Sequence, residues 1–377
     1  MKIAILSAVP WEFSRHRAQH IATGLAERGF RILFFQNIIH INPSELMLNY
    51  KEGNIFVVKK IMKNLYAVNL FLPDLRGKMK FVAEMFGLLL FRLYNRLLDF
   101  EPDAAIFYAP QYRFLLTTLK SKNTKIVYDC VDDFSAFTDL APSRSDIEGA
   151  EESITKASSF VIATSKPLCD RISRITSKCI YLPNACDFSH FNKALRKQRK
   201  PKDIENLKPP IIGFIGAVSD WIDIDLICAL AQRHPDYSIL LAGPIDFGYD
   251  KLINYPNIVC VGTKKYKDLP KYLFFIDVCL IPFKINKLTL ASNPIKLYEY
   301  LAAGKPVVST ALPEVYNNAA EIVAVAEDHD DFIEKVEKAV REKKHEDPSM
   351  VTRRIEFAQA NSWETRVDVV EKLLRNT

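Results

Sequence analysis

Residues 286–310 read NKLTLASNPIKLYEYLAAGKPVVST and carry the clearest pattern of the chain. An apolar run ending at Phe283 precedes them, Pro294 suits the first turn of a helix, and Gly304 suits its end. The run KPVVST at 305–310 then has the character of a buried strand. The segment therefore predicts a strand, a helix and a second strand in succession, the unit from which parallel sheets are built.

The same alternation of short apolar runs and amphipathic segments extends in both directions. The second half contains PPIIGFIGAV (209–218), YSILLAG (237–243), NIVCVG (257–262), DVCLIPF (277–283) and EIVAVAE (321–327). The first half contains KIAILSAV (2–9), RILFFQN (31–37), DAAIFY (103–108), KIVYDCV (125–131), FVIATS (160–165) and CIYLPN (179–184). Because wholly apolar strands need cover on both faces, we expect an α/β protein with two Rossmann-like doubly wound domains facing a cleft.

Apolar periodicity is lost around residues 190–208, where charges and a proline predominate, as is typical of linkers. We therefore expect an N-terminal domain at 1–190, a linker at 191–208 and a C-terminal domain at 209–350. Residues 351–377 have helical spacing and no following strand, and we expect them to cross back onto the first domain.

Composition excludes several classes of protein. The 377 residues are 49% hydrophobic and 25% charged, and the net charge of +6 is too small and dispersed for a nucleic-acid binder. The seven cysteines form no C-x-x-C pair and indicate buried thiols in a reducing compartment. The N-terminus is a poor match to a signal peptide, and no apolar run reaches the roughly 18 to 20 residues of a spanning helix. We expect a cytoplasmic protein.

The segment RGKMKFVAEMFGLLLFRLYNRLL at 76–98 combines several bases with a broad apolar face. Such a helix can lie in a membrane interface, which would make the protein peripheral at the inner face of the membrane. A thick helix packed on the first sheet is the commoner source of this pattern. Both interpretations stay open from the sequence.

The helix opened by Asn293 and Pro294 suits an anionic ligand, because free amides at a helix start bind anions at the carboxyl end of a strand. Lys296 stands in the first turn, where it opposes the helix dipole unless a phosphate is bound. Glu299 is three residues further on and on the same face, and a carboxylate can accept two hydrogen bonds from a ribose diol. The alternative is a surface pair between Lys296 and Glu299.

The segment YDCVDDFSAF at 128–137 places Asp129, Asp132 and Asp133 at the end of a predicted strand. The spacing D-x-x-D-D is loose and no histidine accompanies it, so we expect no metal site. Capping of the following turn by one aspartate is the structural alternative.

Taken together, these blocks resemble those of GT-B glycosyltransferases that build bacterial surface polysaccharides such as teichuronic acid. The resemblance rests on RAQHIATGLAERGFRILF, YDCVDDFSAF, YLPNACDFSHF, GFIGAVSDWIDIDLI and SNPIKLYEYLAAGKPVV. It implies a nucleotide-sugar donor, with UDP favoured, on the second domain and a saccharide or lipid-linked acceptor on the first. It also implies a metal-independent hexosyl transfer with no cofactor beyond the UDP-sugar co-substrate.

The same resemblance assigns the site residues. Lys296 would hold the diphosphate, Glu299 the ribose, and Asp132 would be the catalytic base of an inverting enzyme. The further donor-binding residues would be Gly216, Lys264, Phe283, Asn293 and Ile295, and the acceptor-binding residues Arg17 and His20. The chain departs from the family pattern at Ala291, in place of the first glutamate of E-x7-E, and at Ala217, in place of an arginine.

Those two departures keep other functions open. A non-catalytic GT-B homologue that binds a nucleotide or a glycan would tolerate both alanines. A nucleotide-sugar epimerase on the same scaffold is a second alternative. A two-domain solute-binding protein would also have twin α/β domains, but it would need an export signal.

Overall fold

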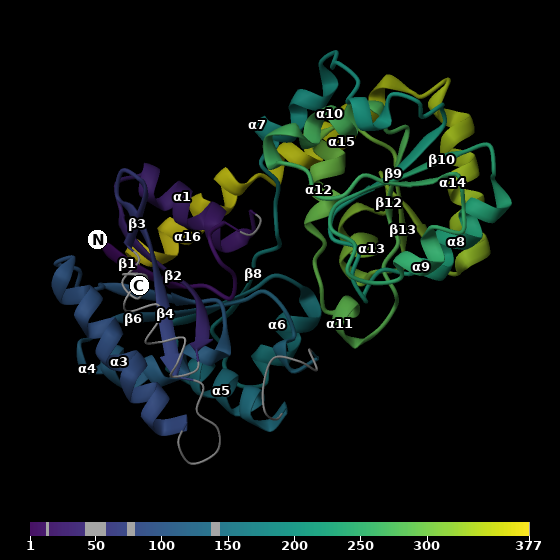
Figure 1. Ribbon diagram of the computed structural model, residues 1–377. Coiled ribbons are helices and arrows are strands. Elements are labelled where there is room, and N and C mark those ends of the chain that lie inside the picture. The colour runs from purple at the N-terminus through teal and green to yellow at the C-terminus, as the bar shows by residue number, and fades with distance from the viewer. Residues whose placement is uncertain (13–14, 42–57, 74–79, 137–143, 377) are drawn as a thin grey trace. The chain divides into compact units, whose positions relative to one another are not determined.

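A computed structural model describes the chain except for residues 13–14, 42–57, 74–79, 137–143 and 377. It consists of two compact units, Met1–Pro183 with Val367–Thr377, and Asn184–Arg366. Figure 1 shows that each unit is a sheet with helices packed on its faces.

The first unit contains a sheet with strand order β3-β4-β2-β1-β5-β6-β7-β8. Only β3 is antiparallel to its neighbour, and the remaining pairs are parallel. Its strands are β1 Lys2–Leu6, β2 Arg31–Ile41, β3 Val58–Met62, β4 Leu65–Pro73, β5 Ala104–Phe107, β6 Lys125–Cys130, β7 Phe160–Ala163 and β8 Cys179–Tyr181. Its helices are α1 Arg17–Glu27, α3 Lys80–Leu97, α4 Leu116–Ser121, α5 Arg144–Ala157 and α6 Lys166–Ser173, with short 3-10 turns η2 Pro110–Leu115 and η3 Phe134–Ala136.

The second unit contains a sheet with order β11-β10-β9-β12-β13-β14, in which every pair is parallel. Its strands are β9 Ile211–Ile215, β10 Ser238–Ala242, β11 Ile258–Cys260, β12 Val278–Ile281, β13 Val307–Thr310 and β14 Ala324–Ala326. Its helices are α7 Phe188–Phe191, α8 Ile224–Arg233, α9 Tyr249–Leu252, α10 Leu269–Phe275, α11 Lys287–Leu290, α12 Ile295–Ala302, α13 Pro313–Ala319, α14 His329–Lys343 and α15 Pro348–Ala360, with 3-10 turns η4 Asn192–Leu195, η5 Lys202–Ile204 and η6 Tyr266–Asp268. The last helix, α16 Trp363–Asn376, begins here and ends in the first unit. The two doubly wound α/β units expected from the sequence are therefore confirmed.

The C-terminal helix returns to the first unit, but over a shorter stretch than expected. Val367, Val370 and Leu374 of α16 are buried in the core formed by β1, β2 and α1. A Cβ on Gly24 of α1 would lie 2.6 Å from Cγ2 of Val367, so a glycine is needed where the two helices meet. Helix α15 instead packs on α12 within the second unit.

The expected linker at 191–208 is also different in the structure, since it lies within the second unit. Phe191, Ala194 and Ile204 are buried in the core of that unit, between charged residues that stay exposed. Three apolar anchors spaced irregularly give no periodic signal, which is why the sequence pattern resembles a linker.

In each unit the strand order reverses direction beside the first strand of the sheet. In the second unit the chain moves outward from β9 to β11 and then returns to β12, on the other side of β9. In the first unit the corresponding reversal lies between β1 and β5. Doubly wound sheets bind ligands at the carboxyl ends of the strands at such a reversal. No helix within the described ranges is both long and apolar enough to cross a membrane.

Candidate active site

The reversal in the second unit brings together residues that the sequence singled out. Gly216 directly follows β9, Phe283 follows β12, and α12 begins at Ile295. The Gly216 amide donates to the carbonyl of Ala242 at 3.0 Å, and a Cβ on Gly216 would lie 3.2 Å from Cε of Lys296. The Lys296 side chain thus lies against the backbone at the end of β9.

Lys296 and Glu299 form an ion pair of 2.6 Å on α12. Spacing predicted this pair, but its environment differs from a surface pair, because Glu299 is only 6% exposed and Lys296 is half-buried. Among the described residues, the carboxylate of Glu299 accepts its hydrogen bond from the ammonium of Lys296. A cation, a buried carboxylate and a helix start are therefore held together at the sheet reversal.

Two further residues shape this edge. A Cβ on Gly243, at the end of β10, would lie 1.9 Å from the carbonyl oxygen of Gly216, so only glycine allows the two strand ends to approach so closely. The hydroxyl of Tyr300 in α12 accepts a hydrogen bond of 2.9 Å from the amide of Ile215. No local signal in the sequence separates Tyr300 from ordinary core aromatics.

The side chain of Asn293 fixes the loop before α12. Its Oδ1 accepts from the amide of Asn184 at 3.0 Å, and its Nδ2 donates to Glu314 at 2.8 Å. Asn293 is 4% exposed, so its side chain is engaged within the protein. Pro294 occupies the cap position and contributes no side-chain oxygen to the first amides of α12.

Lys264 follows β11 and Phe283 follows β12, two strands that β10 and β9 separate in the sheet. The ammonium of Lys264 pairs with Asp203 at 2.7 Å and lies 5.7 Å from the ring centroid of Tyr272. The side chain of Lys264 is therefore engaged by Asp203. We expect a ligand to contact the backbone of Lys264 instead. Phe283 is partly buried against the core, and its carbonyl accepts from Thr310 at 2.8 Å. The donor roles of these residues stay predictions.

In the first unit, Arg17 and Asp129 form a buried ion pair. Nε of Arg17 donates to the two carboxylate oxygens of Asp129 at 3.0 and 2.8 Å, and Nη1 donates to the carbonyl of Pro183 at 3.0 Å. Both side chains are at most 3% exposed. Arg17 therefore connects α1 to the end of β6 and to Pro183. The acceptor-binding roles expected for Arg17 and for His20, which is also buried, stay predictions.

The other two aspartates after β6 are in different environments. Oδ1 of Asp133 accepts from the amide and hydroxyl of Ser135 at 3.1 and 2.6 Å, which is the capping role considered from the sequence. Among the described residues, no hydrogen bond or ion pair is recorded for the carboxylate of Asp132. Burial, followed by the neighbouring charge of Asp133, raises the pKa of Asp132 to about 7. The carboxylate of Asp132 can therefore take up a proton near neutral pH.

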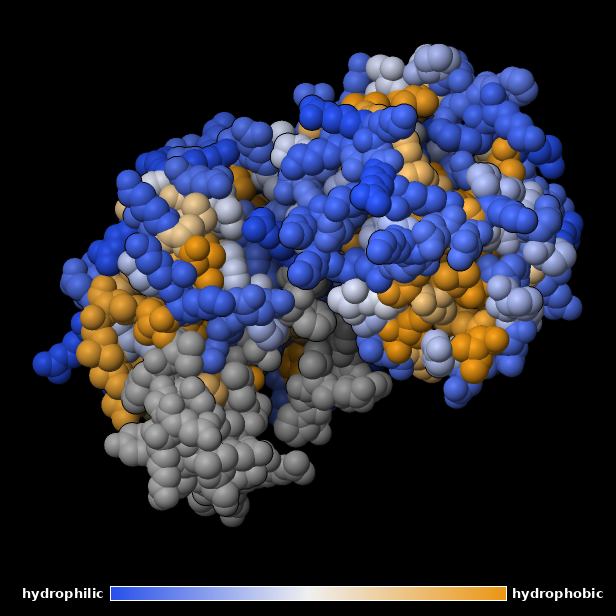
Figure 2. All heavy atoms as spheres, turned by 45° about the horizontal axis from the view of Figure 1, so that its top comes forward, coloured by the Kyte–Doolittle hydropathy of each residue, from blue (hydrophilic) through white to orange (hydrophobic). Residues whose placement is uncertain are grey.

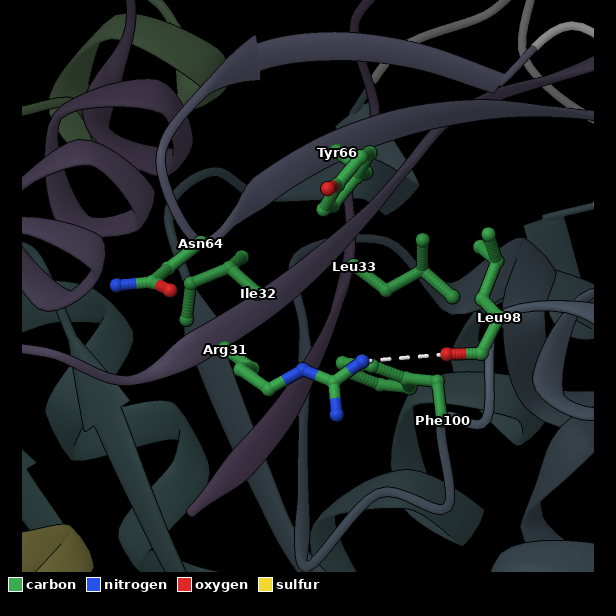
Figure 3. A pocket seen from close by; sticks show the side chains of 7 residues that line it. All are labelled: Arg31, Ile32, Leu33, Asn64, Tyr66, Leu98 and Phe100. Carbon is green, nitrogen blue, oxygen red and sulfur yellow. Dashed lines mark hydrogen bonds between the residues drawn. The ribbon is translucent and has the colours of Figure 1, made fainter.

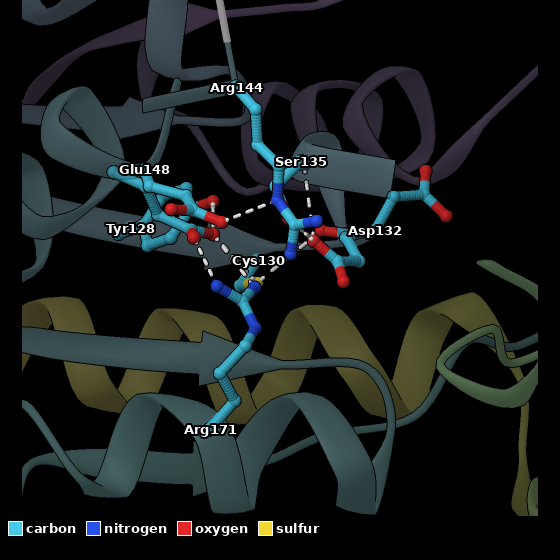
Figure 4. Close-up of polar contacts among 9 residues, drawn as sticks. Tyr128, Cys130, Asp132, Ser135, Arg144, Glu148 and Arg171 are labelled. Atoms are coloured by element: carbon cyan, nitrogen blue, oxygen red, sulfur yellow. Dashed lines mark hydrogen bonds and ion pairs between the residues drawn. The ribbon is translucent and has the colours of Figure 1, made fainter. Parts of the chain in front are cut away.

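A buried network supports the strand that leads to Asp132 (Figure 4). Glu151 of α5 accepts from the Tyr128 hydroxyl at 2.7 Å and from Nη2 of Arg171 at 2.9 Å. Cys130 contributes a longer contact of 3.6 Å to the same carboxylate. Burial raises the pKa of Tyr128 and of Cys130, so both stay protonated and donate. The network joins β6 to α5 and α6.

One cavity of the first unit lies away from these residues. It has a volume of about 130 Å³ and is lined by side chains that include Arg31, Tyr66 and Phe100 (Figure 3). Arg31 is the first residue of β2, so the cavity is at the amino ends of the parallel strands, opposite the edge where doubly wound sheets bind ligands. Over the described ranges, no group of three His, Cys, Asp or Glu side chains is arranged to hold a metal ion.

Known proteins resemble this chain in sequence and in fold. Residues 209–342 match the family "Glycosyl transferases group 1". The chain is 29% identical over 267 residues to TuaH of Bacillus subtilis (strain 168), provisionally named as a teichuronic acid biosynthesis glycosyltransferase. That alignment covers 66% of each protein, slightly less than two thirds of the relative's length.

Solved structures share the fold at low sequence identity. Sucrose-phosphate synthase from Thermosynechococcus elongatus has a TM-score of 0.75 at 16% identity, with 99% of this chain and 98% of that chain covered. HepE of Anabaena, in complex with UDP and glucose, has a TM-score of 0.66 at 13% identity, with 100% and 99% covered. This chain therefore has the GT-B fold of glycosyltransferases, and residues 209–342 of its second unit are similar to the glycosyltransferase group 1 family.

Proposed function

We propose that this protein transfers a sugar from a nucleoside diphosphate donor, with UDP as the nucleotide, to a glycan or lipid-linked saccharide of a bacterial surface polysaccharide. The main support is the position of Lys296, which lies over Gly216 at the sheet reversal and in the first turn of α12. The similarity to TuaH supports the polysaccharide assignment, and the HepE complex supports UDP as the nucleotide.

The donor site would work by placing positive charge where the leaving group develops negative charge. The ammonium of Lys296 and the first amides of α12 would contact the diphosphate, and Gly216 would allow the backbone to approach it. The buried Glu299 would accept the ribose hydroxyls. As the bond between the anomeric carbon and the diphosphate oxygen breaks, these groups stabilise the departing oxygen without reorganising.

Asp132 would act as the base in an inverting transfer. Its carboxylate takes the proton of the acceptor hydroxyl while that oxygen forms the new bond to the anomeric carbon. With its pKa at about 7, the group is ionised above neutral pH and still basic enough to accept a proton. In a retaining enzyme, Asp132 would instead orient the acceptor.

The reaction would require neither a cofactor nor a metal ion, and its acceptor would contact the first unit near His20. We place it in the cytoplasm, because its seven cysteines form no C-x-x-C pair, as expected in a reducing compartment. Activity that survives EDTA would support the metal-free chemistry. Activity that EDTA abolishes and Mn²⁺ or Mg²⁺ restores would contradict it.

A panel of UDP-, GDP- and dTDP-sugars tests the proposal. Release of the nucleoside diphosphate by the purified protein, with and without saccharide acceptors, should be fastest for a UDP-sugar. Asp132→Asn should keep nucleotide binding and lose transfer by about 10²-fold or more. If no sugar nucleotide is consumed although UDP binds, the protein is a non-catalytic binder. If an epimeric sugar nucleotide forms without transfer, it is an epimerase.

A further inference from the structure

The exposed face of α3 carries a continuous row of apolar side chains. In this 18-residue helix, the exposed large apolar residues and their exposed fractions are Phe81 (66%), Val82 (49%), Met85 (53%), Leu89 (61%) and Leu97 (65%). Single exposed apolar residues are ordinary on protein surfaces, but a contiguous set marks an interaction surface. Hydrophobic atoms gather at the left of Figure 2, on the side where Figure 1 shows α3.

Two arginines continue this row. Phe81, Met85 and Leu89 are spaced by four residues, and Arg92 and Arg96 follow at spacings of three and four, so all five lie along one line of the helix. We call these five residues the α3 row. Both arginines are exposed. The row is apolar over its first turns and basic over its last turns.

The orientation of the row is fixed by the opposite face of α3. Leu90, Phe91 and Tyr94 are buried, and the rings of Phe91 and Tyr94 lie 5.1 and 6.3 Å from that of Phe35 in β2. A Cβ on Gly87 would come within 2.6 Å of Cδ2 of Leu72, so the helix lies directly on the sheet. Rotation of α3 to bury the row would expose this core.

Neighbouring acids do not neutralise the basic end. Asp99, just after α3, pairs with Lys2 at 3.7 Å, and Glu101 pairs with Lys122. Glu84 is the acidic residue of α3 itself and is half-buried on a different side of the helix. The described surface of α3 therefore combines exposed apolar side chains with an excess of positive charge.

We propose that the α3 row docks the protein on an anionic phospholipid membrane, with α3 lying flat in the interface. Apolar side chains would enter the boundary between headgroups and acyl chains, while Arg92 and Arg96 would reach lipid phosphates. The row spans about 24 Å along the helix axis, enough for many lipid contacts. The choice of a membrane over a soluble partner rests on the proposed function, because a lipid-linked acceptor is held in a bilayer.

Vesicle flotation tests this proposal. The wild-type protein should float with phosphatidylcholine vesicles that contain phosphatidylglycerol and bind phosphatidylcholine alone more weakly. The double variant Met85→Glu/Leu89→Glu should lose binding at least about tenfold. Ile253→Glu/Tyr316→Glu makes the same change in charge at exposed apolar positions of the second unit and should bind as the wild type does.

Other results would overturn the proposal. Equal flotation of wild type and Met85→Glu/Leu89→Glu, or no flotation of the wild type, contradicts membrane docking by the α3 row. A wild-type dimer that this double variant converts to a monomer would assign the row to a second copy of the chain instead. Arg92→Gln/Arg96→Gln should reduce the preference for anionic vesicles, and an unchanged preference would contradict the charge argument.

Calorimetric titration with UDP separates this proposal from the donor assignment. UDP should bind Met85→Glu/Leu89→Glu as tightly as the wild type, because α3 belongs to the first unit and the proposed donor residues to the second. If UDP binds and the vesicles do not, only the docking proposal fails. If the wild type binds vesicles but no UDP, only the proposed function fails.

Discussion

The raised pKa of Asp132 predicts that this residue weakens folding as pH increases. Its pKa is about 7 in the folded protein against an ordinary value of 3.8. Because the folded-state pKa is raised, the stability associated with neutral Asp132 is fully present below about pH 4 and is lost as pH rises toward 7. A difference of about 3 pH units at about 1.4 kcal/mol each gives a ceiling of about 4 kcal/mol. Contact of the partly exposed side chain with water lowers that ceiling.

Asp132→Asn removes this titration and keeps the shape of the side chain. We therefore expect the variant to gain stability relative to the wild type between pH 5 and 8, by roughly 2 to 3 kcal/mol from the same linkage. Urea unfolding at a series of pH values, followed by tryptophan fluorescence, measures this difference. Asp133→Asn is the matched variant, since its amide oxygen can still accept from Ser135 while its charge is gone. It should reduce the pH dependence without abolishing it, because the charge of Asp133 is the smaller cause of the shift. A stability difference between Asp132→Asn and wild type that does not change with pH would refute the reasoning.

Two further predictions concern groups held inside each unit. Arg17→Met should destabilise the protein by about 3 to 5 kcal/mol in urea unfolding, because it leaves the Asp129 carboxylate buried without its partner. The double variant Arg17→Met/Asp129→Leu should recover much of this loss. An Arg17→Met protein as stable as the wild type would contradict the structural role of the ion pair. Gly243→Ala should weaken UDP binding at least about tenfold in calorimetry, because its Cβ would lie 1.9 Å from the carbonyl of Gly216 and force the two strand ends apart. Gly149→Ala, at an open helix position, is the control, and equal UDP affinity in both variants would contradict the proposed role of this edge.

The parts of the fold that sequence predicted are those with local signals. Apolar runs bounded by turn residues placed the strands of the second sheet and those of the first sheet except β3 and β4, which the sequence did not predict. The i, i+3 rule placed Lys296 and Glu299 on one face of α12. The linker prediction was wrong because Phe191 and Ile204 anchor an irregular segment whose charged residues dominate its composition. Nothing local distinguishes such an anchored segment from a free one.

Contacts between distant residues set the environment of the candidate site, and these could not be predicted from spacing. Arg17 and Asp129 are 112 residues apart, and their pairing removes one aspartate of the acidic segment from consideration as a base. The hydroxyl of Tyr300 reaches the backbone of β9 across 85 residues. Similarly, the packing of α3 on the sheet is confirmed for one face of this helix, while contact of its exposed face with a membrane stays a prediction.

The central claim, that Lys296 and the start of α12 hold the diphosphate of the donor, is tested most directly by calorimetric titration with uridine, UMP and UDP. Wild-type protein should bind UDP most tightly, and Lys296→Ala should weaken UDP binding about tenfold or more while leaving uridine binding unchanged. Lys338→Ala, which removes an exposed lysine of α14, should match the wild type for all three ligands. Absence of UDP binding to the wild type, or UDP affinity unaffected by Lys296→Ala, would contradict the claim.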